Sequence, residues 1–234
     1  LVVGTSADYP PFEFHAEIDG VDTIVGVDIM IAQYFADKIG VELRIEEMAF
    51  DALLISLDQG MFDLVLAGMS PNDERRLAAD FTDDNHFTKW VVMIRKADEA
   101  KYNEMMTDFK DAVIGIQKAS VYGKAAVQMS DKPVVELVKF VDLIIELQNG
   151  KIDAVVANQL TSEAYVSGNP DLMVKDVNIV HDEPGQAAAV QKGNPDFVEY
   201  LNGLQKEMKE SGAFDRFLAE SVALANASGQ EIAE

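Results

Sequence analysis

Two stretches of the sequence decide the fold class, because they repeat each other ninety positions apart. LDQGMFDLVLA occupies positions 57–67, and LQNGKIDAVVA occupies positions 147–157. Each reads as the end of a helix, a glycine, a short step, an aspartate and then a buried strand that ends in alanine. Two similar α/β units in one chain predict two lobes with a ligand cleft between them, since ligands of open α/β sheets bind at the carboxyl ends of strands.

Strand-like and helix-like segments alternate on both sides of this repeat. The N-terminal part predicts strands over 1–5, 41–45 and 63–67, with helices over 26–40 and 50–59 between them. This βαβαβ order indicates a parallel sheet with helical crossovers. The alternation restarts after a strand over 91–94 and a polar helix over 102–110. It continues as strands over 112–117, 134–140, 154–157 and 187–191, and as helices over 122–129, 141–149, 161–166, 196–211 and 214–225.

Composition excludes several classes of protein. The 234 residues carry 41 acidic and 19 basic side chains, a formal net charge of -22, which disfavours binding to nucleic acid or to anionic lipid. The chain has no cysteine, so it forms neither disulfides nor thiolate metal sites. It has three histidines without metal-site spacing, no phosphate-binding loop and no dinucleotide fingerprint. We therefore expect no metal and no cofactor. No apolar run is long enough to span a membrane.

Several motifs resemble one family, the extracellular solute-binding proteins of polar amino-acid ABC transporters. They are VGTSADYPPFEF at 3–14, GVDI at 26–29, FDAL at 50–53, AGMSPNDER at 67–75, ADFTD at 79–83, GKIDAVV at 150–156 and GNPD at 193–196. These motifs follow the family's order over nearly the whole chain.

The resemblance implies a periplasmic-binding-protein-like α/β fold, with two lobes joined by two crossing segments that close on a small ligand. Lobe one is expected over 1–90 and 185–234, and lobe two over 91–184. The implied protein is a monomeric transport receptor and not an enzyme. It is exported by a signal peptide that is then removed, it lies in the periplasm or on the outer face of a bacterial membrane, where a lipid can anchor it, and it works with the membrane permease of an ABC transporter.

Arg75 is the expected partner of a ligand carboxylate, because its planar guanidinium donates two parallel hydrogen bonds and the family places an arginine there. The alternative is a surface arginine near the start of a helix. Ser70 would add a hydroxyl and Gly68 a backbone carbonyl that accepts from an ammonium group. For Ser70 the alternative is a cap of the following helix.

Aromatic residues are expected to form the apolar walls of the site. Tyr9 and Phe50 would pack against the stem of the ligand, although Phe50 also suits an ordinary core position. Phe12 and Phe14 are assigned to the core, and Trp90 to the hinge.

The second lobe departs from the family pattern. Gln117 and Ser120 lie in the segment that by resemblance binds the carboxylate, where Ala119 stands in place of a glycine. Asn158 stands where the family usually has the aspartate that pairs with the α-ammonium. Asn158 can accept a hydrogen bond but carries no charge, so the ammonium would depend on neutral carbonyls, Asp8 or Glu13. The ligand's side chain stays open; Asn72, His86, Gln117 and Tyr122 suit a neutral polar or aromatic group.

Two alternatives remain. A cyclohexadienyl dehydratase-like lyase on the same fold needs an acid to protonate a leaving hydroxyl, and the candidates are Asp8, Glu13 and His86. A ligand-sensing domain of a larger receptor would bind and close in the same way as a transport receptor.

Overall fold

The chain forms two compact units in the computed structural model, which describes residues 1–87, 89–103, 105–181 and 185–231. Unit 1 comprises residues 1–87 and 183–225, and unit 2 comprises residues 88–182 and 226–234. The predicted α/β class is confirmed, because each unit has its own mixed sheet. The lobe boundaries taken from the sequence remain a prediction, and Pro184, the last residue of the predicted second lobe, lies outside the described residues.

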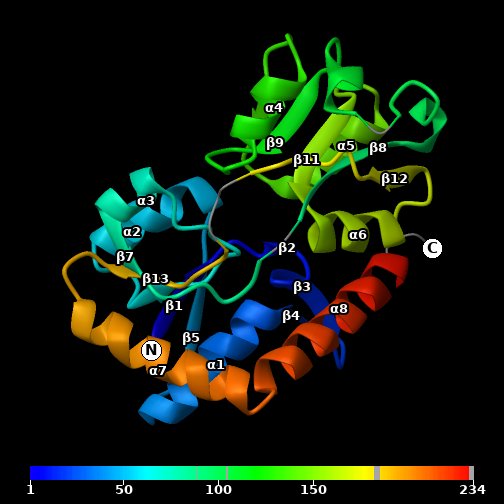
Figure 1. Ribbon diagram of the computed structural model, residues 1–234. Helices are drawn as coiled ribbons and strands as arrows, with labels where there is room; N and C mark the ends of the chain where they lie inside the picture. The colour runs from blue at the N-terminus through cyan, green and yellow to red at the C-terminus, as the bar shows by residue number, and fades with distance from the viewer. Residues whose placement is uncertain (88, 104, 182–184, 232–234) are drawn as a thin grey trace. The chain divides into compact units, whose positions relative to one another are not determined.

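A five-stranded sheet in the order β5-β1-β6-β13-β7 forms the centre of unit 1 (Figure 1). Strands β1 (Val2–Thr5), β5 (Arg44–Glu47) and β6 (Leu64–Val65) are parallel, as the βαβαβ pattern predicts. The returning strand β13 (Ala189–Gln191) is antiparallel to β6 and to β7 (Ala79–Phe81). The parallel strands therefore end at one edge of the sheet, where the chain continues into the loops described below.

Helices of unit 1 bury the apolar stripes that the sequence shows. Helix α1 (Val27–Ile39) buries Ile31, Ala32, Phe35 and Ala36, and it ends at Gly40, whose φ of 81° a side chain would disfavour. The predicted helix over 50–59 is a 3-10 turn, η1 (Phe50–Ala52), followed by α2 (Leu53–Asp58). Unit 1 also contains α3 (Asp73–Ala78), α7 (Pro195–Glu210) and residues 213–225 of α8 (Ala213–Glu231).

A small antiparallel meander in unit 1 has no counterpart among the predicted elements. Strands β2 (Asp8–Tyr9), β3 (Glu13–Ile18) and β4 (Val21–Val25) pair in that order. Asp19 and Gly20 join β3 to β4 with φ values of 53° and 78°. An Asp-Gly pair with positive φ at both positions is a strong local hairpin signal, so the sequence carried the information. The meander matters because it places Asp8, Tyr9 and Glu13 beside the start of α1.

Unit 2 contains a second five-stranded sheet in the order β10-β9-β11-β8-β12. Strands β9 (Ile114–Gln117), β10 (Val135–Leu137) and β11 (Ala154–Asn158) are parallel, while β8 (Trp90–Arg95) runs antiparallel to β11 and to β12 (Leu172–Lys175). Its helices are α4 (Gly123–Met129), α5 (Phe140–Gln148) and α6 (Gln159–Ser167). The predicted helix over 102–110 is only a 3-10 turn, η3 (Met106–Phe109), and a second such turn, η2 (Lys96–Asp98), follows β8.

Among the described residues, no helix combines the length and the apolar character that crossing a bilayer requires.

Candidate functional site

The loop between β6 and α3 carries two of the predicted ligand residues in unit 1, Gly68 and Ser70, and α3 carries a third, Arg75. Gly68 has a φ of 54°, and a Cβ added there would lie 3.2 Å from the Tyr9 ring and 3.2 Å from Nε2 of Gln186. Only glycine fits both this backbone conformation and this space. The Gly68 N–H donates to Oδ2 of Asp28 at 2.8 Å, which fixes the loop to the first turn of α1.

Arg75 is held in one orientation by the same loop. Its Nη1 donates to the carbonyl oxygen of Ser70 at 2.7 Å, and its guanidinium carbon lies 5.2 Å from the centroid of the Phe50 ring. Arg75 is only 9% exposed, so it is not the surface arginine of the alternative reading. A guanidinium clamped between a carbonyl and an aromatic face is pre-organised for a planar anion such as a carboxylate.

The N-cap of α3 is Asn72, so the alternative role of Ser70 as the cap is wrong. The Asn72 Oδ1 accepts from the Arg75 backbone N–H at 2.9 Å. Asn72 therefore has its oxygen engaged in the helix start, whereas Ser70 contributes its backbone carbonyl to Arg75 and keeps a half-buried side chain.

A pair of buried carboxyl groups lies beneath this loop. Glu13 is 0% exposed, and its neighbouring charges are the carboxyls of Asp28 and Asp8. Burial, and then the charges of Asp28 and Asp8, raise the pKa of Glu13 well above its usual range. Burial also raises the pKa of Asp28 to about 6, although the hydrogen bond from the Gly68 N–H opposes the shift. Both carboxyl groups therefore hold their protons to a higher pH than free carboxyl groups do.

Several aromatic residues of unit 1 pack together around the Tyr9 turn. Tyr9, Phe12 and Phe14 are buried, which confirms the core assignment of the two phenylalanines. The rings of Tyr9 and Phe12 stack with centroids 6.1 Å apart. His86 packs between Phe12 and Phe214 at 6.2 Å and 5.9 Å, and burial lowers its pKa. This environment makes His86 a packing residue.

In unit 2, Gln117 is the last residue of β9, and Ser120 lies in the turn that follows. Ala119 between them has a φ of 61°, a conformation that favours glycine, which is the residue expected there by resemblance. Gln117 is buried, and its Nε2 lies 3.5 Å from the carbonyl oxygen of Val138, at the limit of a hydrogen bond. The Ser120 Oγ is buried and has no hydrogen-bond partner among the described residues.

Asn158 ends β11 and caps α6. Its Oδ1 accepts from the Thr161 backbone N–H at 2.8 Å, and its carbonyl oxygen accepts from the Ser162 hydroxyl at 2.8 Å. Asn158 and Thr161 are both 0% exposed. Within the described part of the chain, Nδ2 of Asn158 and Oγ1 of Thr161 have no hydrogen-bond partner.

Trp90 lies opposite Asn158 in the β8–β11 ladder. Its ring stacks on His181 at 4.0 Å and meets Tyr122 edge-on at 4.9 Å. The predicted role of Trp90 in a hinge stays a prediction.

The structure distributes the predicted site residues over the two units. Unit 1 contains Asp8, Tyr9, Phe50, Gly68, Ser70 and Arg75, and unit 2 contains Gln117, Ser120 and Asn158. The sequence analysis missed Asp28, because an acid in the first turn of a helix is usually a solvent-exposed complement to the helix dipole. Across the described residues, no cluster of histidines and acids could hold a metal ion.

Comparison with known proteins identifies the family that this chain matches and several relatives. The profile of the bacterial extracellular solute-binding proteins, family 3, matches residues 1–221. The arginine-binding extracellular protein ArtP of Bacillus subtilis is 30% identical over 222 residues, which are 92% of this chain and 83% of ArtP. The L-cystine-binding protein TcyJ of Escherichia coli is 28% identical over 222 residues, 91% of this chain and 78% of TcyJ.

Solved structures of amino-acid-binding proteins are also similar to this chain. An amino-acid ABC transporter substrate-binding protein, AbpA of Streptococcus pneumoniae, bound to L-arginine, superposes with a TM-score of 0.91 at 32% identity. The match covers 96% of this chain and 95% of that one. Holo ArgBP of T. maritima gives a TM-score of 0.79 at 35% identity, over 89% of this chain and 90% of that one.

Proposed function

The chain belongs to family 3 of the bacterial extracellular solute-binding proteins, and from that premise we propose that it captures a small carboxylate-bearing solute for an ABC importer. The solute is an amino acid or an amino-acid derivative. The named ligands of the relatives, arginine and cystine, differ in their side chains but share an α-carboxylate. The carboxylate is therefore the group that a common binding residue must recognise.

The observation that carries the proposal is the orientation of Arg75. The Ser70 carbonyl and the Phe50 ring fix its guanidinium within unit 1, so little side-chain entropy is lost when it binds an anion. We assign the ligand carboxylate to Arg75. The Ser70 hydroxyl, the Gly68 carbonyl and Asp8 are further polar contacts, and Tyr9 and Phe50 are the apolar ones.

Unit 2 contributes Gln117, Ser120 and Asn158 to the proposed ligand contacts. The buried Ser120 Oγ and the Asn158 Nδ2 support this assignment, because a buried polar atom without a partner costs about 1–3 kcal/mol, a cost that a ligand contact would remove.

A transport role requires the partner that the family uses. The relatives are ligand-binding proteins of ABC transporters, which deliver solute to a membrane permease, and they are not enzymes. The lyase alternative has no support, since its candidate acid Glu13 is fully buried and His86 packs between aromatic rings.

The family is extracellular or periplasmic, and the finer location belongs to the proposal. We place the receptor in the periplasm or on the outer face of a bacterial membrane, and a lipid anchor is the feature that distinguishes the two. Detergent phase partition of the protein from its native cells tests the lipid, because a protein that stays in the aqueous phase carries none.

The experiment that tests the function is a binding screen with a matched pair of variants. Thermal shift against the amino acids and their derivatives identifies a ligand, because a ligand at about a hundred times its Kd adds about 2.7 kcal/mol of stability. Calorimetry on Arg75→Ala should then show affinity lower by a factor of about tens to thousands, since one partner of a buried charge pair is lost.

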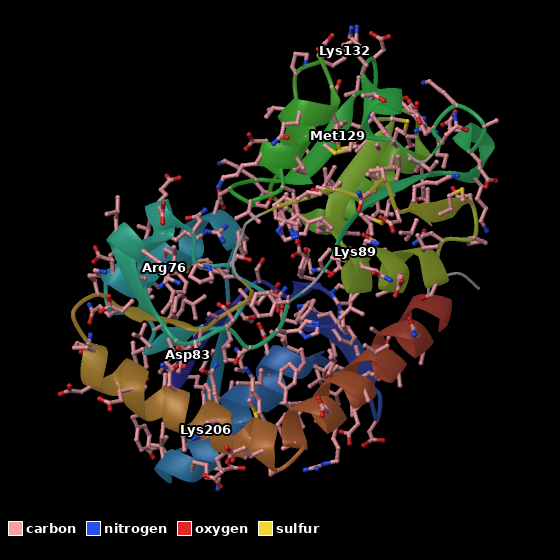
Figure 2. All side chains as sticks on the ribbon, in the orientation of Figure 1. Arg76, Asp83, Lys89, Met129, Lys132 and Lys206 are labelled. Atoms are coloured by element: carbon pink, nitrogen blue, oxygen red, sulfur yellow. The ribbon has the colours of Figure 1, made fainter. Side chains whose placement is uncertain are left out.

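The control is Arg76→Ala. Arg76, labelled in Figure 2, is the next residue of α3 and is exposed, and its Nε donates to the Pro71 carbonyl at 3.1 Å. This variant should bind as the parent does. If Arg75→Ala binds within a few-fold of the parent, Arg75 is not the carboxylate partner.

A further inference from the structure

The orientation of the Asn158 amide is fixed by chemistry. The Thr161 backbone N–H can only donate, so the Asn158 atom that it meets at 2.8 Å must be the oxygen. An amide whose oxygen caps a helix turns its NH₂ group away from that bond. Asn158 therefore offers an NH₂ donor that the helix cap does not use.

The remaining donor is buried beside a second polar atom. Nδ2 of Asn158 and Oγ1 of Thr161 both lie at the first turn of α6, both residues are 0% exposed, and neither atom has a partner among the described residues. Backbone N–H groups at a helix start also favour an electron-rich partner. Two buried polar atoms and a helix N-terminus together make a place for an acceptor.

The charged residues at this edge of the sheet also favour a ligand group that accepts hydrogen bonds. Parallel strands β9, β11 and β12 end at this edge, and β8 begins there. The carboxylate just after β12, Asp176, forms an ion pair with Lys89, which precedes β8 and is labelled in Figure 2. Lys118 follows the end of β9. Lys89 and Lys118 bring positive charge to this edge, and the carboxylate of Asp176 is paired with Lys89.

We propose that the ligand presents a hydrogen-bond acceptor, and not an ammonium group, to Asn158. The inference rests on the proposed function and specifies it: the solute has a carboxylate for Arg75 and a carbonyl or hydroxyl oxygen in place of the α-ammonium of an ordinary amino acid. An ammonium group beside Asn158 would bring its N–H donors against the Nδ2 donor, and two donors cannot form a hydrogen bond with each other. A 2-oxo acid, a 2-hydroxy acid or an N-acylated amino acid has the required oxygen.

The test compares matched ligands that differ only at the α position. Calorimetry is run on the parent with L-arginine, L-phenylalanine, L-leucine and L-glutamate, each beside its own 2-oxo analogue. The parent should bind the 2-oxo member of at least one pair about tenfold or more tightly than the amino acid. If every pair that binds prefers the amino acid, the inference is overturned while the proposed function stands.

The variant Asn158→Asp reverses the polarity without removing the cap, because aspartate and asparagine cap helices equally well. One carboxylate oxygen keeps the Thr161 N–H, and the other replaces the donor with a charged acceptor. The preference should move by about tenfold or more toward the amino acid. If Asn158→Asp prefers the 2-oxo acid over the amino acid as strongly as the parent does, the inference is overturned.

Asn149→Asp is the matched control, since it adds the same charge on the exposed turn after α5. It should leave the preference unchanged, and an equal shift in both variants would reduce the effect to net charge and overturn the inference. If no compound binds to the parent, the proposed function fails and the inference fails with it.

Discussion

The repeated turn before β6 in unit 1 and the turn before β11 in unit 2 use the same backbone design. Gly60 and Gly150 have φ values of 74° and 71°. Asp63 donates its N–H to the Val2 carbonyl at 2.8 Å and accepts the Val2 N–H at 2.7 Å. Asp153 donates to the Val113 carbonyl at 2.7 Å and accepts the Val113 N–H at 2.9 Å. In both units this aspartate joins the turn to the neighbouring parallel strand.

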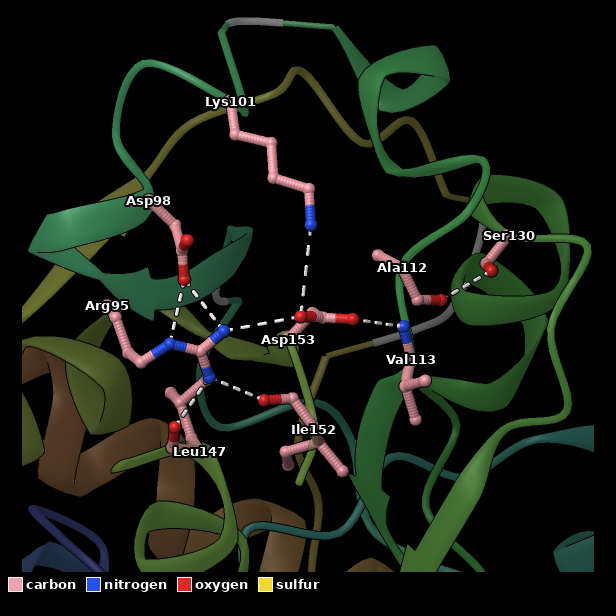
Figure 3. Close-up of polar contacts among 9 residues, drawn as sticks. All are labelled: Arg95, Asp98, Lys101, Ala112, Val113, Ser130, Leu147, Ile152 and Asp153. Atoms are coloured by element: carbon pink, nitrogen blue, oxygen red, sulfur yellow. Dashed lines mark hydrogen bonds and ion pairs between the residues drawn. The ribbon is translucent and has the colours of Figure 1, made fainter. Parts of the chain in front are cut away.

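The two turns differ in what surrounds the carboxylate. Asp63 is exposed. Asp153 is bound by Nη2 of Arg95 at 3.2 Å and lies 3.9 Å from Nζ of Lys101 (Figure 3). Arg95 also donates to the carbonyls of Leu147 and Ile152, both at 2.6 Å, and pairs with Asp98 at 2.7 Å. The aspartate of the repeated turn thus makes backbone hydrogen bonds in unit 1, whereas in unit 2 it also belongs to a network of charged side chains.

A second contrast concerns how each unit accommodates a carboxyl group away from solvent. Unit 2 pairs the half-buried Asp153 with Arg95, whereas unit 1 buries Glu13 and Asp28 together, and burial raises the pKa of both. A guanidinium stays charged at all relevant pH values, but a carboxyl group with a raised pKa loses its proton as the pH rises through that value. The stability of the two units should therefore respond to different perturbations.

The largest effect is expected from Arg95→Ala. It leaves two carbonyls and two carboxylates without their donor, so the free energy of unfolding should fall by about 3 kcal/mol. Urea unfolding measures it, and the exposed Arg44→Ala should change stability by less than about 0.5 kcal/mol. A loss as small as that of the control would mean that Arg95 does not hold unit 2 together.

Glu13→Gln should change the stability in a way that depends on pH. Because burial raises the pKa of Glu13 in the folded state, its contribution to stability is full below the pKa of the unfolded chain, about 4, and is lost as the pH rises through the raised folded value; for Asp28 the folded value is about 6. The variant should therefore be more stable than the parent at pH 7 and no more stable at pH 4.

Thermal melts across this pH range test the Glu13 prediction. Glu17→Gln, on the exposed face of β3, controls for the loss of one negative charge. Parallel pH profiles of the parent and Glu13→Gln would contradict the raised pKa of Glu13.

The smallest effect is the difference between Asp153→Asn and Asp63→Asn. Both variants keep an acceptor for the backbone N–H, but only Asp153 loses charged partners, so it should cost about 1 kcal/mol more. Urea unfolding of the two variants checks the order. Equal losses would show that the backbone tie alone matters and that the network around Asp153 is incidental.

The sequence alone predicted the α/β architecture and, among the candidate site residues of unit 1, Arg75. Hydrophobic periodicity is a local property, so it identified α1, the parallel strands and the repeated turn before the fold was known. The motif at 67–75 identified Arg75 by the chemistry of its side chain. Two predictions from local sequence failed. The meander over 8–25 was not predicted, although the Asp19-Gly20 pair is a hairpin signal, and the polar segment over 102–110 forms only a 3-10 turn in place of the predicted helix.

Only the tertiary structure brings Asp28 beside Glu13 and engages the side-chain oxygen of Asn158. Nothing near Asp28 in the sequence shows that the meander and the Gly68 loop bury it against Glu13, because those segments are distant along the chain. Asn158 can donate or accept until folding commits its oxygen to Thr161. Residue type sets what a side chain is able to do, and its neighbours in space select which of those things it does.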